Sequence, residues 1–486
     1  MKRNFVIAAL FALSFLVPNA SFGQYAEQAL RLSNLSYGGT ARFTGMGGAF
    51  GAIGGDFTTL SINPAGIGVY KISEFSLTPL IYNTRSFSQY YGTHQQEFSA
   101  RMNLNNAGFI FAANTNGSLK AIQFGLGYNR LANFNNSIHF EGFNDENSFV
   151  RALSVIATQA SQNNDYDINY PFYVDELAGS VNLLYQKEGS NEWFADVNKN
   201  VNQSVWLRQE GGIDEMVFTF GGNYSDELYF GATLGIPVMS YRHTYQYDEG
   251  SPSDSTQFKS MYYDEIYESN GSGVNGKFGV IFKPVSFFRI GAAIHTPTYY
   301  WLIQESEWMT MGSYFRDSIQ WNKTMSTQER QFEYNQTTPM RLIGSLAFVI
   351  GKIALISADY EWVDHGMNTL RPSWDRVMSS ANWEIRDSYK SQHIVRAGFE
   401  LRRDDFFFRG GYGWYSSPFQ DKNVNDMSLN TWSLGAGFRA GAFGFDFAYQ
   451  NARSKSKYYP YAANPSPSAN MTNNANSYIM TLTYRY

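Results

Sequence analysis

The feature that most constrains this sequence is the strict alternation of apolar side chains with polar or small ones in its C-terminal third. Segment 442–450 carries an aromatic ring at every second position, namely at Phe443, Phe445, Phe447 and Tyr449. Segments 395–402, 431–439 and 477–486 alternate in the same way. Because successive side chains of a β-strand point to opposite faces, this period of two predicts strands with one apolar face and one polar or small face.

Alternating runs recur along the whole chain after residue 71. We count fourteen, near 72–88, 98–114, 119–136, 213–224, 227–245, 271–283, 286–303, 330–350, 353–364, 388–403, 405–415, 428–440, 442–453 and 475–486. Short turns, expected at Asn116-Gly117, Ser225-Asp226, Lys283-Pro284, Gly351-Lys352, Asp404-Asp405 and Gly441, alternate with long connections. This arrangement is typical of barrels that place turns on one side of a membrane and loops on the other.

The N-terminus predicts export. Lys2 and Arg3 precede an apolar run over residues 5–17, which is too short to cross a bilayer as a helix. Small residues at Ser21 and Gly23 place signal-peptide cleavage after Gly23, with Ala20 as the second choice. The chain contains no cysteine, which excludes a lipid anchor at the cleavage point, disulfides and cysteine-ligated zinc.

Alternation alone does not separate a membrane barrel from a soluble sandwich. Three further features favour the barrel: the signal peptide, the aromatic last residue Tyr486, and a composition with 17% aromatic and only 16% charged residues. Soluble domains average about 25% charged residues. We therefore predict an all-β transmembrane barrel of about 14 antiparallel strands in the outer membrane of a Gram-negative bacterium. The expected division is a signal peptide over 1–23, an N-terminal plug over 24–71, and the barrel over 72–486.

The segment before the first strand is rich in glycine. It contains Gly45, Gly47 and Gly48, then Asp56, then the triplet Asn63, Pro64 and Ala65. A dinucleotide-binding loop is excluded because its third glycine would fall at Phe50. Glycine instead allows a compact chain to pack inside a narrow lumen. In the triplet, asparagine can cap a turn, proline fixes φ, and alanine allows close approach to the wall.

These motifs resemble the plug, or hatch, of the FadL-type transporter family, which includes long-chain fatty acid transporters and toluene/xylene-type channels. The resemblance covers residues 28–69 and implies a fourteen-stranded barrel that takes up hydrophobic molecules passively. It also implies that substrate leaves sideways through a kink in the third strand. Here that strand is 119–136, where Gly125, Gly127, Asn129 and Asn133 are poor strand formers. Whether the hatch gates transport or only stabilises the barrel stays open.

The resemblance implies as partners long-chain fatty acids, lipids or hydrocarbons, together with outer-membrane lipid, and we expect a monomer without cofactor. A net charge of −5 argues against nucleic acid. The alternative is a surface receptor that binds a partner or haem through the long connection 137–212, where Phe149, Leu153, Ile156 and Ala157 recur at helical spacing. The six histidines form no metal or catalytic pattern, so we predict no enzyme and no metal site. Inward charges are predicted to form a salt-bridged ring against the plug: Arg396, Glu400, Arg402, Arg409, Arg439, Asp446 and Arg485.

Overall fold

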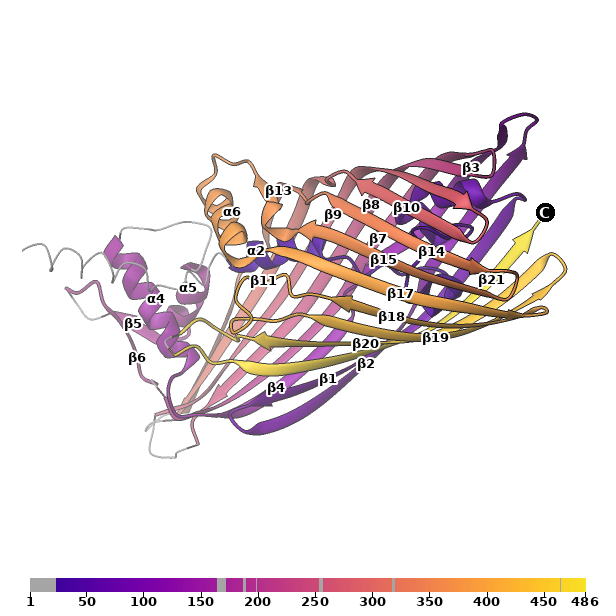
Figure 1. Cartoon of the computed structure of the whole chain (residues 1–486). Helices are drawn as coiled ribbons and strands as arrows, with labels where there is room; N and C mark the ends of the chain where they lie inside the picture. The colour runs from indigo at the N-terminus through magenta and orange to yellow at the C-terminus, as the bar shows by residue number, and fades with distance from the viewer. Residues whose placement is uncertain are drawn as a thin grey trace, which may run out of the picture.

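The fold is a closed 14-strand antiparallel barrel (Figure 1). The computed structural model describes residues 23–486 except 164–171, 187–188, 198, 253–256, 317–319 and 464, so most of the predicted signal peptide lies outside the described residues. The last strand pairs with the first from Glu74↔Arg485 to Gln89↔Asn470, and this pairing closes the barrel.

The strands follow one another around the barrel in chain order, and three of the fourteen positions are each built from two strands. The bounds are β1 (Glu74–Tyr90), β2 (Thr93–Asn114), β3 (Leu119–Asn133) with β4 (Asn136–Asn144), β7 (Val201–Tyr224), β8 (Leu228–Gly250), β9 (Phe258–Val285), β10 (Phe288–His295) with β11 (Tyr299–Arg316), β13 (Arg330–Thr337) with β14 (Arg341–Ile350), β15 (Ala354–Asp364), β17 (Ser391–Arg403), β18 (Phe406–Tyr415), β19 (Leu429–Ala440), β20 (Phe443–Tyr458) and β21 (Ala469–Arg485).

The fourteen predicted runs all fall on strands, but several strands extend further toward the long loops. Strand β7 begins at Val201 rather than near 213, and β9 begins at Phe258 rather than near 271. Both extensions carry polar residues on both faces, which removes the apolar–polar contrast on which the prediction depended. The prediction of a turn at Lys283-Pro284 was wrong, because β9 continues to Val285 and the turn is at 286–287.

The outer face of the barrel is apolar and exposed. Every second residue of β20 illustrates this, with Phe443, Phe445 and Phe447 each about half exposed. The last residue, Tyr486, is exposed as well. Lumen-facing residues of the same strand are buried, including Asp446 and Ala448. A soluble protein instead buries its apolar side chains and exposes its polar ones. The apolar outer face and polar inner face found here fit a wall that faces lipid.

The N-terminal segment lies inside the barrel. It comprises α2 (Gly23–Ser33), α3 (Ala41–Gly45), η1 (Phe57–Ser61) and η2 (Pro64–Val69), and almost every residue between 39 and 70 is buried. The helix α3 contacts β18 to β21, whereas η2 contacts β7, β8 and β9 on the other side of the lumen. We call residues 23–70 the lumen segment.

Helices and short strands cover the long-loop end of the barrel (Figure 1). They are α4 (Phe149–Asn163), α5 (Phe172–Ser180), β5 (Leu184–Gln186), β6 (Trp193–Ala195), β12 (Gln320–Ser326), η3 (His365–Met367), β16 (Thr369–Arg371) and α6 (Arg376–Ser388). Helix α4 confirms the helix expected from the spacing of Phe149, Leu153, Ile156 and Ala157, but β4 and β7 occupy much of the connection expected over 137–212. Among the described helices, none is both long and apolar enough to span a bilayer.

Candidate functional site: the filled lumen and the broken third strand

The glycine-rich turn after α3 presses directly against the barrel wall. Gly47 and Gly48 adopt φ of 65° and 78°, a left-handed conformation that other residues enter only with strain. A Cβ on Gly47 would lie 2.8 Å from the backbone nitrogen of Tyr412 in β18. The wall matches this approach, since a Cβ on Gly398 or Gly411 would lie 2.1 Å from backbone atoms of the turn. Gly45 similarly faces Gly435. Side chains on both partners are therefore excluded here.

Asp56 joins two parts of the lumen segment. Its carboxylate accepts hydrogen bonds from the hydroxyl of Thr40, at 2.6 Å, and from the backbone N–H of Thr58, at 3.0 Å. Thr40 in turn caps α3 by accepting from the N–H of Phe43. The acidic residue of the motif thus closes the loop between α3 and η1, as side-chain caps do at helix starts.

Asn63 holds the second turn to the wall. Its Oδ1 accepts from the N–H of Ala65 at 3.1 Å, and its Nδ2 donates to the carbonyls of Gly51 at 2.6 Å and Val280 at 3.2 Å. Pro64 begins η2, where its missing N–H costs nothing. Ala65 is fully buried against β8 and β9, so the three residues expected from the sequence lie together at one wall contact.

Charged wall residues surround the lumen segment. The guanidinium of Arg42 binds both carboxylate oxygens of Glu400, at 2.9 and 3.0 Å, and Arg409 bridges Glu400 at 2.6 Å to Asp446 at 2.7 Å. The other predicted residues form the ion pairs Arg396–Glu361, Arg439–Asp446 and Arg485–Glu74. The predicted ring is confirmed except at Arg402, which lies exposed at the short-turn end and donates to the carbonyl of Asp404.

Further wall residues that the sequence analysis did not single out bind the backbone of the lumen segment. Asp359 accepts from the N–H groups of Phe50 and Gly51, each at 3.0 Å. Nε2 of His295 donates to the carbonyl of Ile62 at 2.7 Å, and Gln123 donates to that of Tyr70 at 2.7 Å. Their only sequence signal was a polar residue on the lumen face of a strand. Together these contacts satisfy backbone groups that would otherwise be buried without partners.

The third strand is interrupted between β3 and β4. Strand β2 pairs with β3 only from Asn106↔Asn129 to Asn114↔Ala121, and β4 pairs with β7 alone. Asn133 ends β3, and its Oδ1 accepts from both the backbone N–H and the Nδ2 of Asn135. The backbone ladder of the barrel is therefore open between β4 and the long-loop half of β2.

We compared the chain with protein-family models, curated proteins and solved structures. Neither a family model nor a curated protein matches the chain. Among solved structures, the toluene transporter TodX of P. putida matches with a TM-score of 0.55, at 11% identity over 93% of this chain and 99% of that one. A Pseudomonas aeruginosa FadL homologue matches with a TM-score of 0.52, at 11% identity over 92% and 98%. The chain has the fold of the FadL-type channels. The toluene transporter TbuX of Ralstonia pickettii shares it, with a TM-score of 0.50 at 14% identity over 92% and 98%.

Within this FadL-type fold, the four residues proposed for the third strand divide into two groups. Gly125, Gly127 and Asn129 lie in the regularly paired part of β3, and only Asn133 lies at the break. A Cβ on Gly125 would lie 2.8 Å from a side-chain carbon of Leu60, and one on Gly127 would lie 2.6 Å from Phe57. Their lack of a side chain thus makes room for the lumen segment.

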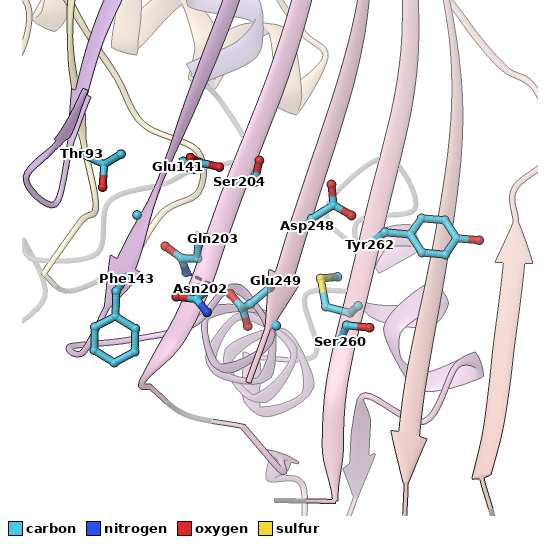
Figure 2. Close-up of a pocket in the computed structure, with 13 residues that line it drawn as sticks. Thr93, Glu141, Phe143, Asn202, Gln203, Ser204, Asp248, Glu249, Ser260 and Tyr262 are labelled. Atoms are coloured by element: carbon cyan, nitrogen blue, oxygen red, sulfur yellow. Dashed lines mark hydrogen bonds between the residues drawn. The ribbon is translucent and has the colours of Figure 1, made fainter. Parts of the chain in front are cut away.

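A pocket of about 550 Å³ lies at the long-loop ends of the strands β2, β4, β7, β8 and β9 (Figure 2). Its lining from β4, β7, β8 and β9 includes Glu141, Asn202, Gln203, Asp248 and Glu249. The Glu249 carboxylate accepts from Gln203 and from the backbone N–H of Phe149, each at 2.9 Å, so it caps α4. Glu249 and Gln203 of this pocket therefore help to anchor α4 to the barrel.

Several histidines have structural partners. His365 bonds with the hydroxyl of Ser33 and with Gln392, and His243 pairs with Glu265. His139 stacks on Trp206, with ring centroids 3.8 Å apart. Among the described residues, no group of three or more histidine and carboxylate side chains could hold a metal ion.

Proposed function

We propose that this chain is an outer-membrane channel for the passive uptake of hydrophobic compounds, with release sideways through the wall. The observation that carries the proposal is the break in the third strand beside a lumen occupied by the chain's own N-terminal segment. A molecule that enters from the long-loop end meets buried helices and ion pairs along the barrel axis, whereas the wall between β2 and β4 lacks its hydrogen-bond ladder. Lateral exit into lipid suits an apolar molecule because it never has to enter water.

The proposed substrates are long-chain fatty acids, or lipids and hydrocarbons of comparable character. Two observations support this class. The solved structures that share the fold are described as toluene transporters, a monoaromatic hydrocarbon channel and a FadL homologue. The interior of the barrel around α2 is apolar, since Tyr241, Tyr300 and Met239 are buried in one cluster with Leu30 of the lumen segment.

We further propose that residues 24–71 act as a hatch. In this proposal Gly45, Gly47 and Gly48 seat one side of the hatch on β17 to β19, and Asn63, Pro64 and Ala65 seat the other side on β8 and β9. Asp56 ties the two halves together through Thr40. Lumen segment and wall contact each other through both hydrogen bonds and ion pairs, so we expect the hatch to stay in place during transport.

The test is uptake of labelled oleate and labelled toluene by a transporter-null host that expresses the full chain. We expect uptake of at least one compound well above an empty-vector control. Expression of the chain and its heat-modifiable migration on gels verify that the barrel has assembled. Uptake no higher than the vector for both compounds, with normal assembly, would refute the proposal.

The receptor alternative assigns binding to the connection 137–212. The described part of this connection folds back onto the barrel: Val150 and Leu153 of α4 and Leu177 of α5 are buried in one cluster with Phe258 and Met311 of the wall. Because its described part packs inward on the wall, the connection 145–200 covers the barrel rather than forming a free receptor loop, and we call it the cap. We therefore retain the channel as the proposed function.

A further inference from the structure

Beside the break, the β1–β2 hairpin overlaps the neighbouring strands instead of lying edge to edge with them. Ser86 and Ser88, on the lumen face of β1, donate to Oδ1 of Asn136 at 2.8 Å and to the carbonyl of His139 at 2.5 Å. Both acceptors belong to β4, so β4 lies on the inner side of β1. The long-loop half of the hairpin therefore covers β4 from outside, and we call residues 83–103 the flap.

A pair of charged residues shows the same overlap at β7. Arg101 of β2 forms an ion pair with Glu210 of β7. Arg101 shares the lumen face of β2 with Asn105, which donates to the carbonyl of Gly39 inside the barrel. Glu210 shares the outer face of β7 with Trp206, which is 43% exposed. The lumen face of β2 in the flap therefore contacts the outer face of β7, which requires that the flap lie outside β7.

Side chains replace the missing backbone ladder across this seam. Gln95 of the flap donates to Glu141 of β4 at 2.6 Å. Glu210 accepts from Arg208 at 2.9 Å as well as pairing with Arg101, so one carboxylate holds two guanidinium groups. Asn103, also in the flap, has a buried Nδ2 without a hydrogen-bond partner among the described residues. At the tip of the flap, Tyr90 is buried against Phe140 of β4 and donates from its hydroxyl to Gln203 of β7 at 2.5 Å. The seam is thus closed by side-chain contacts, apolar at the tip and polar along the rest of the flap, rather than by a continuous backbone ladder.

We propose that Arg101 and Glu210 form a latch that holds the flap over the lateral opening, and that substrate exit requires this latch to separate. The proposal rests on the proposed function, because it names the step that limits sideways release. The contact is suited to this role because exposed ion pairs are weak and form or break without rearrangement of the barrel. A paired strand could not open in this way, since each backbone bond lost in lipid is costly.

The matched control is the pair Arg242–Glu268. It is also an exposed ion pair between neighbouring strands, with N···O of 2.9 Å and side-chain exposures of 50% and 33% against 39% and 32% for Arg101 and Glu210. The difference is that Arg242 and Glu268 face each other within the continuous β8–β9 ladder. Loss of this control pair should leave the wall closed.

The experiment measures flap position and uptake in the same variants of the full chain. Because the chain has no cysteine, Met102→Cys and Trp206→Cys provide the sole attachment points for two spin labels across the seam. In proteoliposomes, Arg101→Gln or Glu210→Gln should broaden the distance distribution toward longer values, whereas Arg242→Gln should not. Oleate uptake should rise roughly two- to five-fold in the two latch variants, because loss of an exposed ion pair should increase the population of molecules with an open flap by about this factor.

The two readouts separate failure of the latch from failure of the proposed function. Heat-modifiable migration first verifies that each variant assembles. A distance distribution and an uptake rate that both stay at the wild-type value in Arg101→Gln and Glu210→Gln would overturn the latch. The channel function would be overturned if the wild-type chain showed no uptake. If the spin labels nevertheless moved apart in the latch variants, the flap would be upheld as a mobile part of the wall.

Discussion

Glycines in the lumen serve close approach as well as backbone conformation, and the two roles can be separated at single residues. Gly47 combines a φ of 65° with a wall so near that a Cβ would lie 2.8 Å from a backbone nitrogen. Gly441, in a short turn, has a similar φ of 57° but nothing within 4 Å of the Cβ position. Comparison of the two isolates the contact with the wall from the strain of the left-handed conformation.

We predict that Gly47→Ala destabilises the protein more than Gly441→Ala. The turn variant should cost about 1 kcal/mol from backbone strain alone. The lumen variant adds overpacking of roughly 1–3 kcal/mol, because neither β18 nor the lumen segment can retreat. Urea unfolding in detergent micelles measures the difference. Equal midpoints for the two variants would show that the wall yields at Gly47.

Asn63 provides a second residue-scale prediction. Asn63→Ala removes hydrogen bonds to Ala65, Gly51 and Val280 and leaves buried backbone groups unpaired, at about 1 kcal/mol or more for each. We expect faster amide hydrogen exchange over residues 57–69, a barrel that remains heat-modifiable, and lower oleate uptake. Asn191→Ala, in an exposed connection, is the control. Unchanged exchange would contradict the anchoring role, and unchanged uptake alone would leave the triplet a structural element.

At the scale of elements, the cap packs through α4 and α5 onto the long-loop ends of β8, β9 and β11. Helix α5 carries Asp175, whose side chain is buried and whose Oδ1 lacks a partner among the described residues. Burial raises the pKa of Asp175 from 3.8 to about 8. The folded cap therefore holds this carboxyl protonated at a pH where the unfolded segment ionises it.

The sign of the pH dependence follows from this difference. Because the folded form binds the proton more tightly, the stability of the cap is greatest below about pH 4 and falls as the pH rises toward 8. We expect hydrogen exchange in α4 and α5 to become faster, relative to the barrel strands, between pH 5 and pH 8. Asp175→Asn should remove this dependence. A wild-type cap whose relative protection is constant over that range would contradict the prediction.

At the scale of the whole molecule, the barrel closes without the cap. Asn144 and Val201 are already cross-strand partners at the base of the connection that contains α4 and α5. Replacement of residues 145–200 by a two-residue Asn-Gly turn should therefore leave a barrel that migrates as heat-modifiable and retains oleate uptake. Loss of assembly would show that the cap stabilises the barrel, and loss of uptake with normal assembly would assign capture of substrate to the cap.

Local periodicity in the sequence determined the barrel, its strand number and most of its short turns, because a strand between lipid and lumen must alternate at every residue. The lumen motifs were likewise visible as runs of glycine and capping residues. Contacts between distant segments were not visible. The sequence did not reveal that Gly125 and Gly127 make room for Leu60 and Phe57, or that Arg101 and Glu210 meet because one hairpin overlaps another strand. Local pattern reports which face a side chain occupies, whereas only the tertiary structure decides what that face meets.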